Sequence, residues 1–184
     1  MRTLAITQNM SADGSVELLS DWFDPGDQSD DLVAEAHRQS ETEEFMLLGR
    51  QTFTDFRSYW PHQTDDPTGF TDLLNNVQKL VVSSTLGDPG WQNSTVLGSD
   101  WRDRVRALKE EDGGDITVTG SLTLCPALIE EGLVDEFRLF VFPAIQGRGR
   151  RLFPDGYETR LALVESRAFS NGVVLTIYRT AQGG

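Results

Sequence analysis

The chain has 184 residues, 38% of them hydrophobic and 24% charged, which fits a single globular domain of ordinary composition. Its formal net charge of −13 repels phosphate backbones, so we expect no nucleic-acid partner. No apolar run approaches the roughly 18–20 residues of a membrane span, and the apolar stretch at the N-terminus is too short for a signal peptide. Cys125, His37 and His62 have no partners at metal-ligand spacing. We therefore predict a cytoplasmic protein without a metal site or a membrane partner.

Eight short apolar segments rich in β-branched residues predict the strands of one sheet. Several of the early segments are continuously apolar, which is typical of parallel strands buried on both faces. Asn171 and Gly172, between the last two segments, are a strong hairpin signal, so these two strands should be antiparallel. The segments are residues 4–6, 45–48, 80–82, 94–97, 116–118, 137–142, 161–166 and 173–178.

Helical patterns lie between several of these strands. They cover residues 30–39, a stretch that begins near Trp101, and a stretch around Pro126 that Gly132 can end. Strands that alternate with helices indicate right-handed crossovers and a largely parallel sheet. The predicted fold class is therefore α/β, a mainly parallel mixed sheet with an antiparallel C-terminal hairpin, in one domain over residues 1–184.

Two long loops, residues 20–29 and 59–69, carry several aromatic side chains. Long loops in a small domain often form the rim of a site. The aromatic residues have two equally good interpretations, an apolar wall for a substrate or packing in the core or a dimer contact. They are Trp22, Phe23, Tyr59 and Trp60.

The stretch from Val118 to Leu122 has the residue types of an anion-binding turn. A buried strand ends at Thr119, and a helix must begin a few residues later. Gly120 lacks a Cβ, so a phosphate can approach backbone N–H groups there, and Ser121 offers a hydroxyl near the positive end of the next helix. The alternative is a glycine that only makes the corner, which is the commoner case for this pattern alone.

Two further predicted strands also end in polar turns. Gly49, Arg50 and Thr52 follow one of them, and Ser83 follows the next. The Arg50 guanidinium can bind phosphate, although for this stretch alone a surface ion pair and a helix cap are the favoured interpretation. Because parallel strands end at the same edge of a sheet, the three turns should lie together, where open α/β sheets bind ligands.

The turn at Asp13 and Gly14 follows the first strand, and Asp13 could either relay a proton or only organise the turn. The arginine-rich residues 147–151 could bind phosphate or pair with surface acids. The motifs of serine hydrolases, P-loop nucleotide binders and dinucleotide-binding Rossmann folds are all missing.

Taken in order, several stretches of the chain resemble stand-alone members of the dihydrofolate-reductase-like superfamily. They are similar to the reductase domain at the C-terminus of the bifunctional riboflavin-biosynthesis deaminase–reductase. The resemblance covers essentially the whole chain and depends on the order and spacing of the stretches together. They are residues 11–14, 48–53, 59–61, 113–121, 132–136, 147–153 and 169–174.

The resemblance implies a three-layer α/β/α domain that forms homodimers and binds NADPH across the strand ends. Matched by position, four residues after the fifth strand would contact the pyrophosphate. These are Thr119, Gly120, Ser121 and Leu122.

The resemblance also places the rest of the site. Gly49, Arg50 and Thr52 would hold the adenosine-side phosphates, and Ser83 would lie near the 2′-phosphate. The nicotinamide and the substrate would be lined by the first turn and the aromatic loops, through Asp13, Gly14, Trp22, Tyr59 and Trp60.

Two departures from the family's pattern affect the cofactor and the substrate. Many relatives have an arginine after the serine that matches Ser83, and this chain has Ser84, which removes a contact of about 1.5–3 kcal/mol and makes NADH possible as well. For the acid that holds a pterin ring in dihydrofolate reductases, Asp30, Asp31 and Glu35 are candidates, although a solvated helix face is the simpler interpretation.

We therefore predict an NADPH-dependent reductase that transfers a hydride to a small heterocyclic or carbonyl/imine substrate. Such an enzyme is dihydrofolate-reductase-like, or similar to the 5-amino-6-(5-phosphoribosylamino)uracil reductases. The main alternative is a dinucleotide-binding sensor or partner-binding dimer with little turnover. A structural dimer with a vestigial site is the third hypothesis.

Overall fold

An eight-stranded sheet with the order β4-β3-β2-β5-β1-β6-β8-β7 forms the centre of the computed structural model, which describes residues 1–26 and 28–180. The pairs among β1 to β6 are parallel, whereas β8 runs antiparallel to both β6 and β7. The predicted mixed sheet and its C-terminal hairpin are thus confirmed. The strands are β1 Leu4–Ser11, β2 Glu43–Gly49, β3 Gln78–Val82, β4 Ser94–Leu97, β5 Asp115–Thr119, β6 Glu136–Phe142, β7 Leu161–Ala168 and β8 Val174–Thr180.

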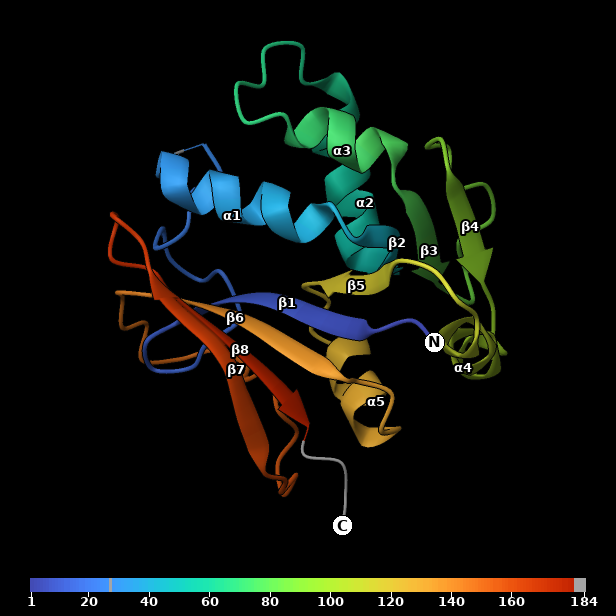
Figure 1. The fold of residues 1–184 in the computed structure, drawn as a ribbon. Helices are drawn as coiled ribbons and strands as arrows, with labels where there is room; N and C mark the ends of the chain where they lie inside the picture. Colours follow the sequence, from blue (N-terminus) through green and yellow to red (C-terminus); the bar gives the residue numbers. More distant parts are fainter. Residues whose placement is uncertain (27, 181–184) are drawn as a thin grey trace.

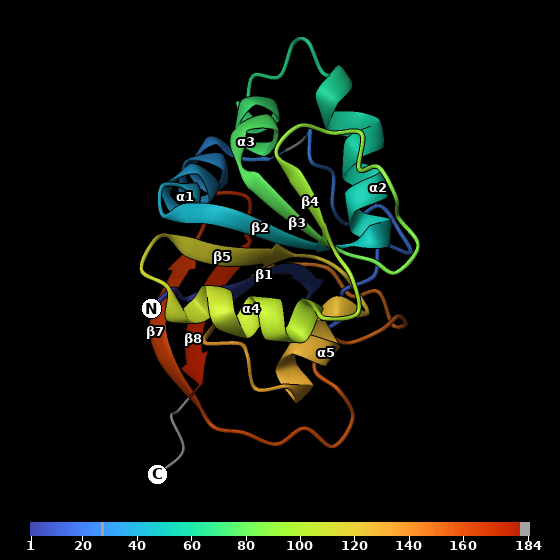
Figure 2. The same cartoon turned by 90° about the vertical axis from the view of Figure 1, so that its right-hand side faces the viewer.

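Helices cover the sheet on both faces, which gives the predicted three layers (Figures 1 and 2). On one face lie α1 (Asp30–Ser40), α2 (Arg50–Tyr59) and α3 (Phe70–Asn76). On the other face lie α4 (Trp101–Glu110) and α5 (Leu124–Glu130). Within the described part of the chain, no helix has the length and apolar character needed to cross a membrane.

The core differs between the two faces of the sheet. Under α4 and α5 it is a continuous apolar cluster that includes Leu4, Ile116 and Phe137, all fully buried. On the other face the buried apolar residues separate into two smaller clusters, one around Leu32 of α1 and one around Phe53 of α2. The space between these two clusters holds the candidate site.

The segment 59–69 is more regular than the predicted loop. Tyr59 is the last residue of α2, and residues Trp60–His62 form a 3-10 turn. The carboxylate of Asp66 accepts hydrogen bonds from the backbone N–H groups of Thr68 and Thr71, at 2.9 and 2.8 Å, and so fixes the start of α3. Helix α3 has only seven residues, too few for its apolar spacing to be recognised in the sequence.

Candidate functional site

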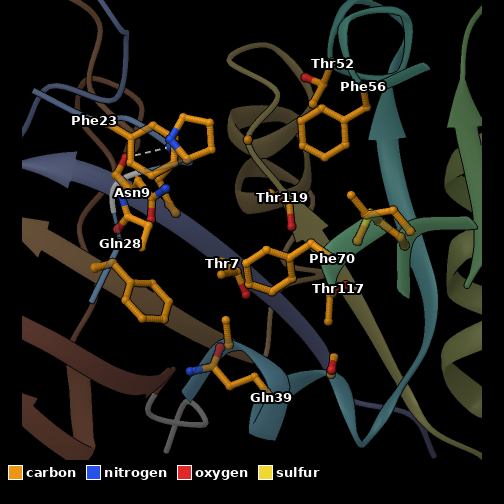
Figure 3. A pocket seen from close by; sticks show the side chains of 18 of the residues that line it. Thr7, Asn9, Phe23, Gln28, Gln39, Thr52, Phe56, Phe70, Thr117 and Thr119 are labelled. Carbon is orange, nitrogen blue, oxygen red and sulfur yellow. Dashed lines mark hydrogen bonds between the residues drawn. The ribbon is translucent and has the colours of Figure 1, made fainter. Parts of the chain in front are cut away.

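A cavity of about 550 Å³ lies between the sheet and helices α1, α2 and α3 (Figure 3). This volume lies within the range of known small-molecule sites. The strands β1, β2, β5 and β6 supply its floor, and the three helices and the segment after β1 supply its walls. The cavity extends from the carboxyl end of β5, at Thr119 and Gly120, to the first residue of β2, Glu43.

The floor of the cavity is polar. Thr7 pairs in register with Thr119 of β5 on one side and with Arg138 of β6 on the other, so the three side chains stand in one row across the sheet. Thr7, Asn9 and Thr119 line the cavity, and their side chains make no hydrogen bond within residues 1–26 and 28–180. These groups are therefore available to a bound molecule.

The sequence contained a signal for this floor that the prediction missed. Thr7 and Asn9 alternate with buried residues of β1, and Thr117 and Thr119 do the same in β5. Two parallel strands with polar residues at every second position indicate a sheet face that is not filled by core side chains. The prediction considered residues 116–118 only as a β-branched strand segment and did not use the polar side chain of Thr117.

Glu43 marks the inner end of the cavity. Its carboxylate accepts a hydrogen bond from the hydroxyl of Thr117, and burial raises the pKa of Glu43 to about 7, although Thr117 and the charge of Arg138 act in the opposite direction. Arg138, which is 7% exposed, contacts carboxylate oxygens of Asp115 and Glu136, each at 2.8 Å. Sequence reasoning did not single out Glu43, Thr117 or Arg138.

Aromatic side chains form much of the cavity wall. Trp22 and Phe23 line it and pack on Phe142, with ring centroids 5.4 and 5.5 Å apart. Tyr59 and Trp60 line it from the end of α2. All four aromatic residues predicted for the rim therefore lie at one cavity, on the same side of the sheet as α1 to α3.

The turns after β2 and β5 lie in direct contact at the other end of the cavity. A Cβ added to Gly49 would come within 2.2 Å of the Ser121 Oγ, so a larger residue would require the Ser121 hydroxyl to rotate away. Gly120 has φ +63° and Ser121 has φ +75°, so both adopt the left-handed conformation. Residues with a side chain, such as Ser121, rarely adopt it. The two predicted phosphate-binding turns are thus brought together.

Helix α2 directs its N-terminus at the same point. Gly49 is the residue before its first turn, and none of the described side chains caps the free backbone N–H groups there. Thr52, in that first turn, lies 3.7–4.0 Å from the position of a Gly120 Cβ and also lines the cavity. Arg50 is exposed and forms no ion pair within the described residues. These groups fit an anion such as a pyrophosphate.

Ser83 and Leu122 lie apart from this cavity. The Ser83 Oγ accepts hydrogen bonds from the backbone N–H groups of Thr85 and Leu86, at 3.2 and 2.9 Å, and so organises the turn after β3. The Leu122 side chain packs against the core under α5. The Ser83 hydroxyl proton and the Leu122 backbone remain available to contact a cofactor.

The Asp13 carboxylate organises a loop and does not line the cavity. Its carboxylate accepts hydrogen bonds from the Ser11 hydroxyl at 2.6 Å and from the backbone N–H groups of Gln146 and Gly147 at 3.1 and 2.7 Å. These bonds hold the pKa of Asp13 at about 2, so the group is an anion at neutral pH. The structure therefore favours the turn-organising role over the proton relay, and neither Asp13 nor Gly14 lines the cavity.

Gln146 ties the same loop to the aromatic wall. Its Oε1 accepts hydrogen bonds from the Trp22 Nε1 at 2.9 Å and the Leu19 backbone N–H at 3.0 Å. Its Nε2 donates to the Ser15 Oγ at 2.7 Å and to the Glu17 carbonyl at 3.0 Å. One side chain thus fixes the segment 15–22, and with it the position of the Trp22 ring.

We expect Gln146→Ala to destabilise this wall. Loss of several hydrogen bonds at one side chain should lower the free energy of unfolding by about 1–3 kcal/mol and speed amide hydrogen exchange in segment 15–22. Gln63→Ala, which removes a single bond to the Tyr59 carbonyl, is the control and should stay within about 0.5 kcal/mol of the parent. Unchanged exchange in segment 15–22 would show that Gln146 does not hold it.

Of the three candidate acids of α1, Asp30 is exposed as predicted, whereas Asp31 is half-buried and Glu35 is buried. Glu35 is 1% exposed and its carboxylate binds the side chains of Arg38 and Gln39, at 2.7–2.8 Å, and that of Arg167 at 3.3 Å. Asp31 accepts hydrogen bonds from the backbone N–H and hydroxyl of Ser170, at 2.8 and 2.9 Å. Neither carboxylate lines the cavity, because each is bound to the β7–β8 hairpin.

Comparison with known proteins agrees with this architecture. The family model of the RibD C-terminal domain matches residues 2–175. The chain belongs to the RibD C-terminal domain family. This RibD-type chain is 34% identical to the uncharacterized protein YyaP of Bacillus subtilis (strain 168) over 136 residues, 72% of each protein.

Solved structures of similar fold include two that cover nearly the whole chain. One is described as a riboflavin biosynthesis protein from Shewanella sp. PV-4, with 19% identity, a TM-score of 0.73 and coverage of 98% of this chain and 99% of that one. The other is dihydrofolate reductase from Enterococcus faecalis complexed with NADP(H) and RAB-propyl, with 15% identity, a TM-score of 0.64 and coverage of 98% and 97%. At these identities the likeness establishes a dihydrofolate-reductase-like fold for this RibD-type domain.

Proposed function

We propose that this protein is an NADPH-dependent reductase that transfers a hydride to a small heterocyclic or carbonyl/imine substrate. The observation that carries the proposal is that one cavity reaches both the glycine turn at Gly120 and the N-terminal turn of α2 at Thr52. A phosphate-binding turn that opens directly into a ligand-sized cavity suits a cofactor whose reactive ring must lie beside a substrate. Membership in the RibD C-terminal domain family supports a reductase-type function.

The dinucleotide would be held at the paired turns. Backbone N–H groups of Gly120 and Ser121, the first turn of α2 and the Thr52 hydroxyl would bind the pyrophosphate. When bound, the reduced nicotinamide supplies the hydride. The aromatic wall around Trp22 and Trp60 would exclude water from the reacting atoms, and the polar floor at Thr7 and Asn9 would orient the substrate.

The preference for NADPH over NADH depends on few charges in this acidic chain. Arg50 is exposed beside the first turn of α2, where it can reach a phosphate of the adenosine half. The position after Ser83 is Ser84, which is exposed and adds no cation. We therefore propose NADPH as the preferred cofactor through Arg50 and expect NADH to bind more weakly.

Ligand binding and turnover are tested separately. NADPH at about one thousand times its Kd should stabilise the folded protein by about 4 kcal/mol, measured as a rise in Tm. With dihydrofolate, pyrimidine or carbonyl compounds present, loss of absorbance at the reduced-nicotinamide band measures turnover. Stabilisation without consumption across the panel would favour the dinucleotide-binding sensor, and no stabilisation at all would contradict the proposal.

A further inference from the structure

The negative charge of the chain is concentrated in the segment that builds the cavity walls. Residues 12–77, which include α1, α2, α3 and the segment after β1, contain 15 acidic residues and three arginines, a net charge of −12. Residues 78–184 contain 14 acidic and 12 basic residues. Nearly all of the formal charge of −13 therefore belongs to one segment, whose helices cover one face of the sheet (Figure 1).

Ion pairs to the rest of the protein neutralise only a small part of this charge. Among the described residues, three acidic side chains of the segment pair with arginines that lie outside it, which leaves −9 of the −12. The walls of the cavity thus remain strongly negative. The pairs are Glu17 with Arg150, Glu35 with Arg167 and Glu44 with Arg2.

Some of the remaining aspartates stand at the cavity itself. Asp55 lines it, and Asp21 and Asp72 directly precede the lining residues Trp22 and Leu73. These three aspartates are exposed, and the described part of the chain offers none of them an ion-pair partner. Their charges are therefore free to act on a molecule that enters.

The cavity lining adds no free positive charge in the described residues. Arg138 is the one arginine that lines it, and Asp115 and Glu136 each contact this arginine at 2.8 Å. Arg148 and Arg151 are exposed on the loop after β6 and do not line the cavity. The field at the cavity should therefore attract a cation and repel an anion.

Aromatic side chains stand on both sides of the cavity. Trp22 and Phe23 belong to the apolar cluster beside α1, whereas Phe56, Trp60 and Phe70 belong to the cluster beside α2. Figure 3 shows Phe23, Phe56 and Phe70 around the polar floor. The face of an aromatic ring carries partial negative charge and binds cations, so both sides favour a positively charged ring.

These aromatic rings are not occupied by cations of the protein. Among the described residues, five arginine or lysine side chains stack over an aromatic ring, 4.5–5.8 Å from its centroid, and none of these five rings lines the cavity. The rings of the cavity are thus available to a cationic ligand. The five occupied rings are Phe45, Phe53, Trp91, Trp101 and Phe169.

We propose that the substrate of this site is a flat organic cation with an alkylated ring nitrogen, such as a cyclic iminium ion, held between the two groups of aromatic side chains. This inference rests on the proposed function, since it takes the Gly120 end of the cavity for the cofactor. Recognition depends on the permanent charge, because an alkylated nitrogen has no N–H to donate. The acidic walls raise the local concentration of the cation, and the ring faces hold it.

A cationic substrate also balances the reduction without a proton. The substrate carbon beside the positive nitrogen gains the hydride, so a new C–H bond forms there and a C–H bond of the reduced nicotinamide breaks. The π electron pair of the C=N bond moves to the nitrogen, which becomes neutral, and the oxidised nicotinamide takes over the positive charge. Asp13, the acid considered for a proton relay, does not line the cavity, and this reaction requires no such acid.

Three quinoline compounds of similar size test the charge preference. 1-Methylquinolinium is a permanent cation, 4-methylquinoline has nearly the same shape and is uncharged in mildly alkaline buffer, and quinoline-4-carboxylate is an anion. In the parent, isothermal titration at low salt should show that the cation binds at least about 10-fold more tightly than 4-methylquinoline, and the carboxylate more weakly than both. The preference should shrink at about 0.5 M salt, which screens the walls. Equal binding of the cation and 4-methylquinoline would overturn the proposal.

Neutralising the walls should reduce this preference. The variant Asp21→Asn/Asp55→Asn/Asp72→Asn should lower the ratio of the two affinities about 3-fold or more at low salt. A control variant removes the same charge at α4, on the other face of the sheet, and should keep the parent ratio. It is Asp103→Asn/Glu110→Gln/Glu111→Gln.

Trp60→Leu tests the contribution of a ring face. Leucine is apolar but has no ring, so the ratio of the two affinities should fall about 5-fold. The loss of packing weakens both compounds and cancels in the ratio. Circular dichroism and Tm confirm that each variant is folded. A ratio that stays unchanged in both the Trp60 and the wall variants would overturn the proposal.

NADPH titration and turnover separate the two proposals. In the parent, 2-methyl-3,4-dihydroisoquinolinium, a cyclic iminium ion, should be reduced with loss of absorbance at the reduced-nicotinamide band. If the cations are preferred but NADPH does not bind, the reductase proposal fails and the ligand class stands. If NADPH binds but the cations are not preferred, the ligand class is wrong and the proposed function stands. Binding of both without reduction would overturn the cation as the hydride acceptor.

Discussion

Gly120→Val should abolish measurable NADPH binding, a loss of at least about 100-fold in Kd, while most of the fold is retained. Gly120 lies at φ +63°, where a β-branched side chain is strained, and its Cβ would stand beside Thr52 in the space proposed for the pyrophosphate. The branched methyl groups would keep a phosphate away from the backbone N–H groups of the turn. Isothermal titration of NADPH measures the loss.

Gly132→Val is the matched control for this prediction. Gly132 has φ +66°, and a Cβ there meets nothing within 4 Å, so the variant experiences a similar backbone strain far from the proposed cofactor site. Both variants should lose at least about 1–2 kcal/mol of unfolding free energy, whereas only Gly120→Val should lose NADPH. If Gly120→Val binds NADPH as the control does, the pyrophosphate does not lie at this turn.

Arg138→Met should have the largest effect on stability, a loss of about 3–5 kcal/mol at neutral pH. Arg138 is the buried cation between Asp115 and Glu136, and its removal leaves both carboxylates without this partner beside Glu43. Urea denaturation at several pH values measures the effect. Arg104→Met is the control, because Arg104 is exposed on α4 with no ion pair within the described residues, and it should change stability by less than about 0.5 kcal/mol.

The loss in Arg138→Met should shrink as the pH falls from 8 to 5. Burial already raises the folded-state pKa of Glu43 to about 7, above its ordinary value near 4.5. A carboxyl with a raised pKa favours the folded protein below its ordinary value, and this contribution disappears as the pH rises through 7. Without Arg138 the pKa of Glu43 should rise further, so a loss that does not depend on pH would show that the two groups are not coupled.

The sequence was sufficient to predict the strands because their buried centres are apolar. Each of the eight predicted segments matches a strand, with only Val173 falling outside, just before β8. The observed strands extend beyond the segments where polar residues such as Asn9 and Ser11 continue the pairing. The meeting of the turns at Gly49 and Gly120 was also predictable, since parallel strands end at one edge. This part of the site depends on backbone geometry, which the glycines at the strand ends indicate directly in the sequence.

The opposite end of the site could not be predicted because it depends on side chains far apart in the chain. The sequence pattern predicts Glu35 to be a surface residue on an amphipathic helix. In the structure Glu35 is buried, and the β7–β8 hairpin brings Arg167 to it as an ion-pair partner. Glu43 and Arg138 are 95 positions apart and meet only across the assembled sheet. Charged residues of this kind carry no local signal of burial.

A register shift in β2 decides which of two adjacent glutamates belongs to the cavity. Glu43 lies opposite Asp115 and Phe45 opposite the next residue, Ile116, so β2 has one extra residue at this point. Counting alternate positions back from Met46, which shares the cavity face, arrives at Glu44, yet Glu44 binds Arg2 and Glu43 binds Thr117. An ungapped comparison with a relative that lacks this bulge would therefore align Glu44, which binds Arg2, with the position that lines the cavity.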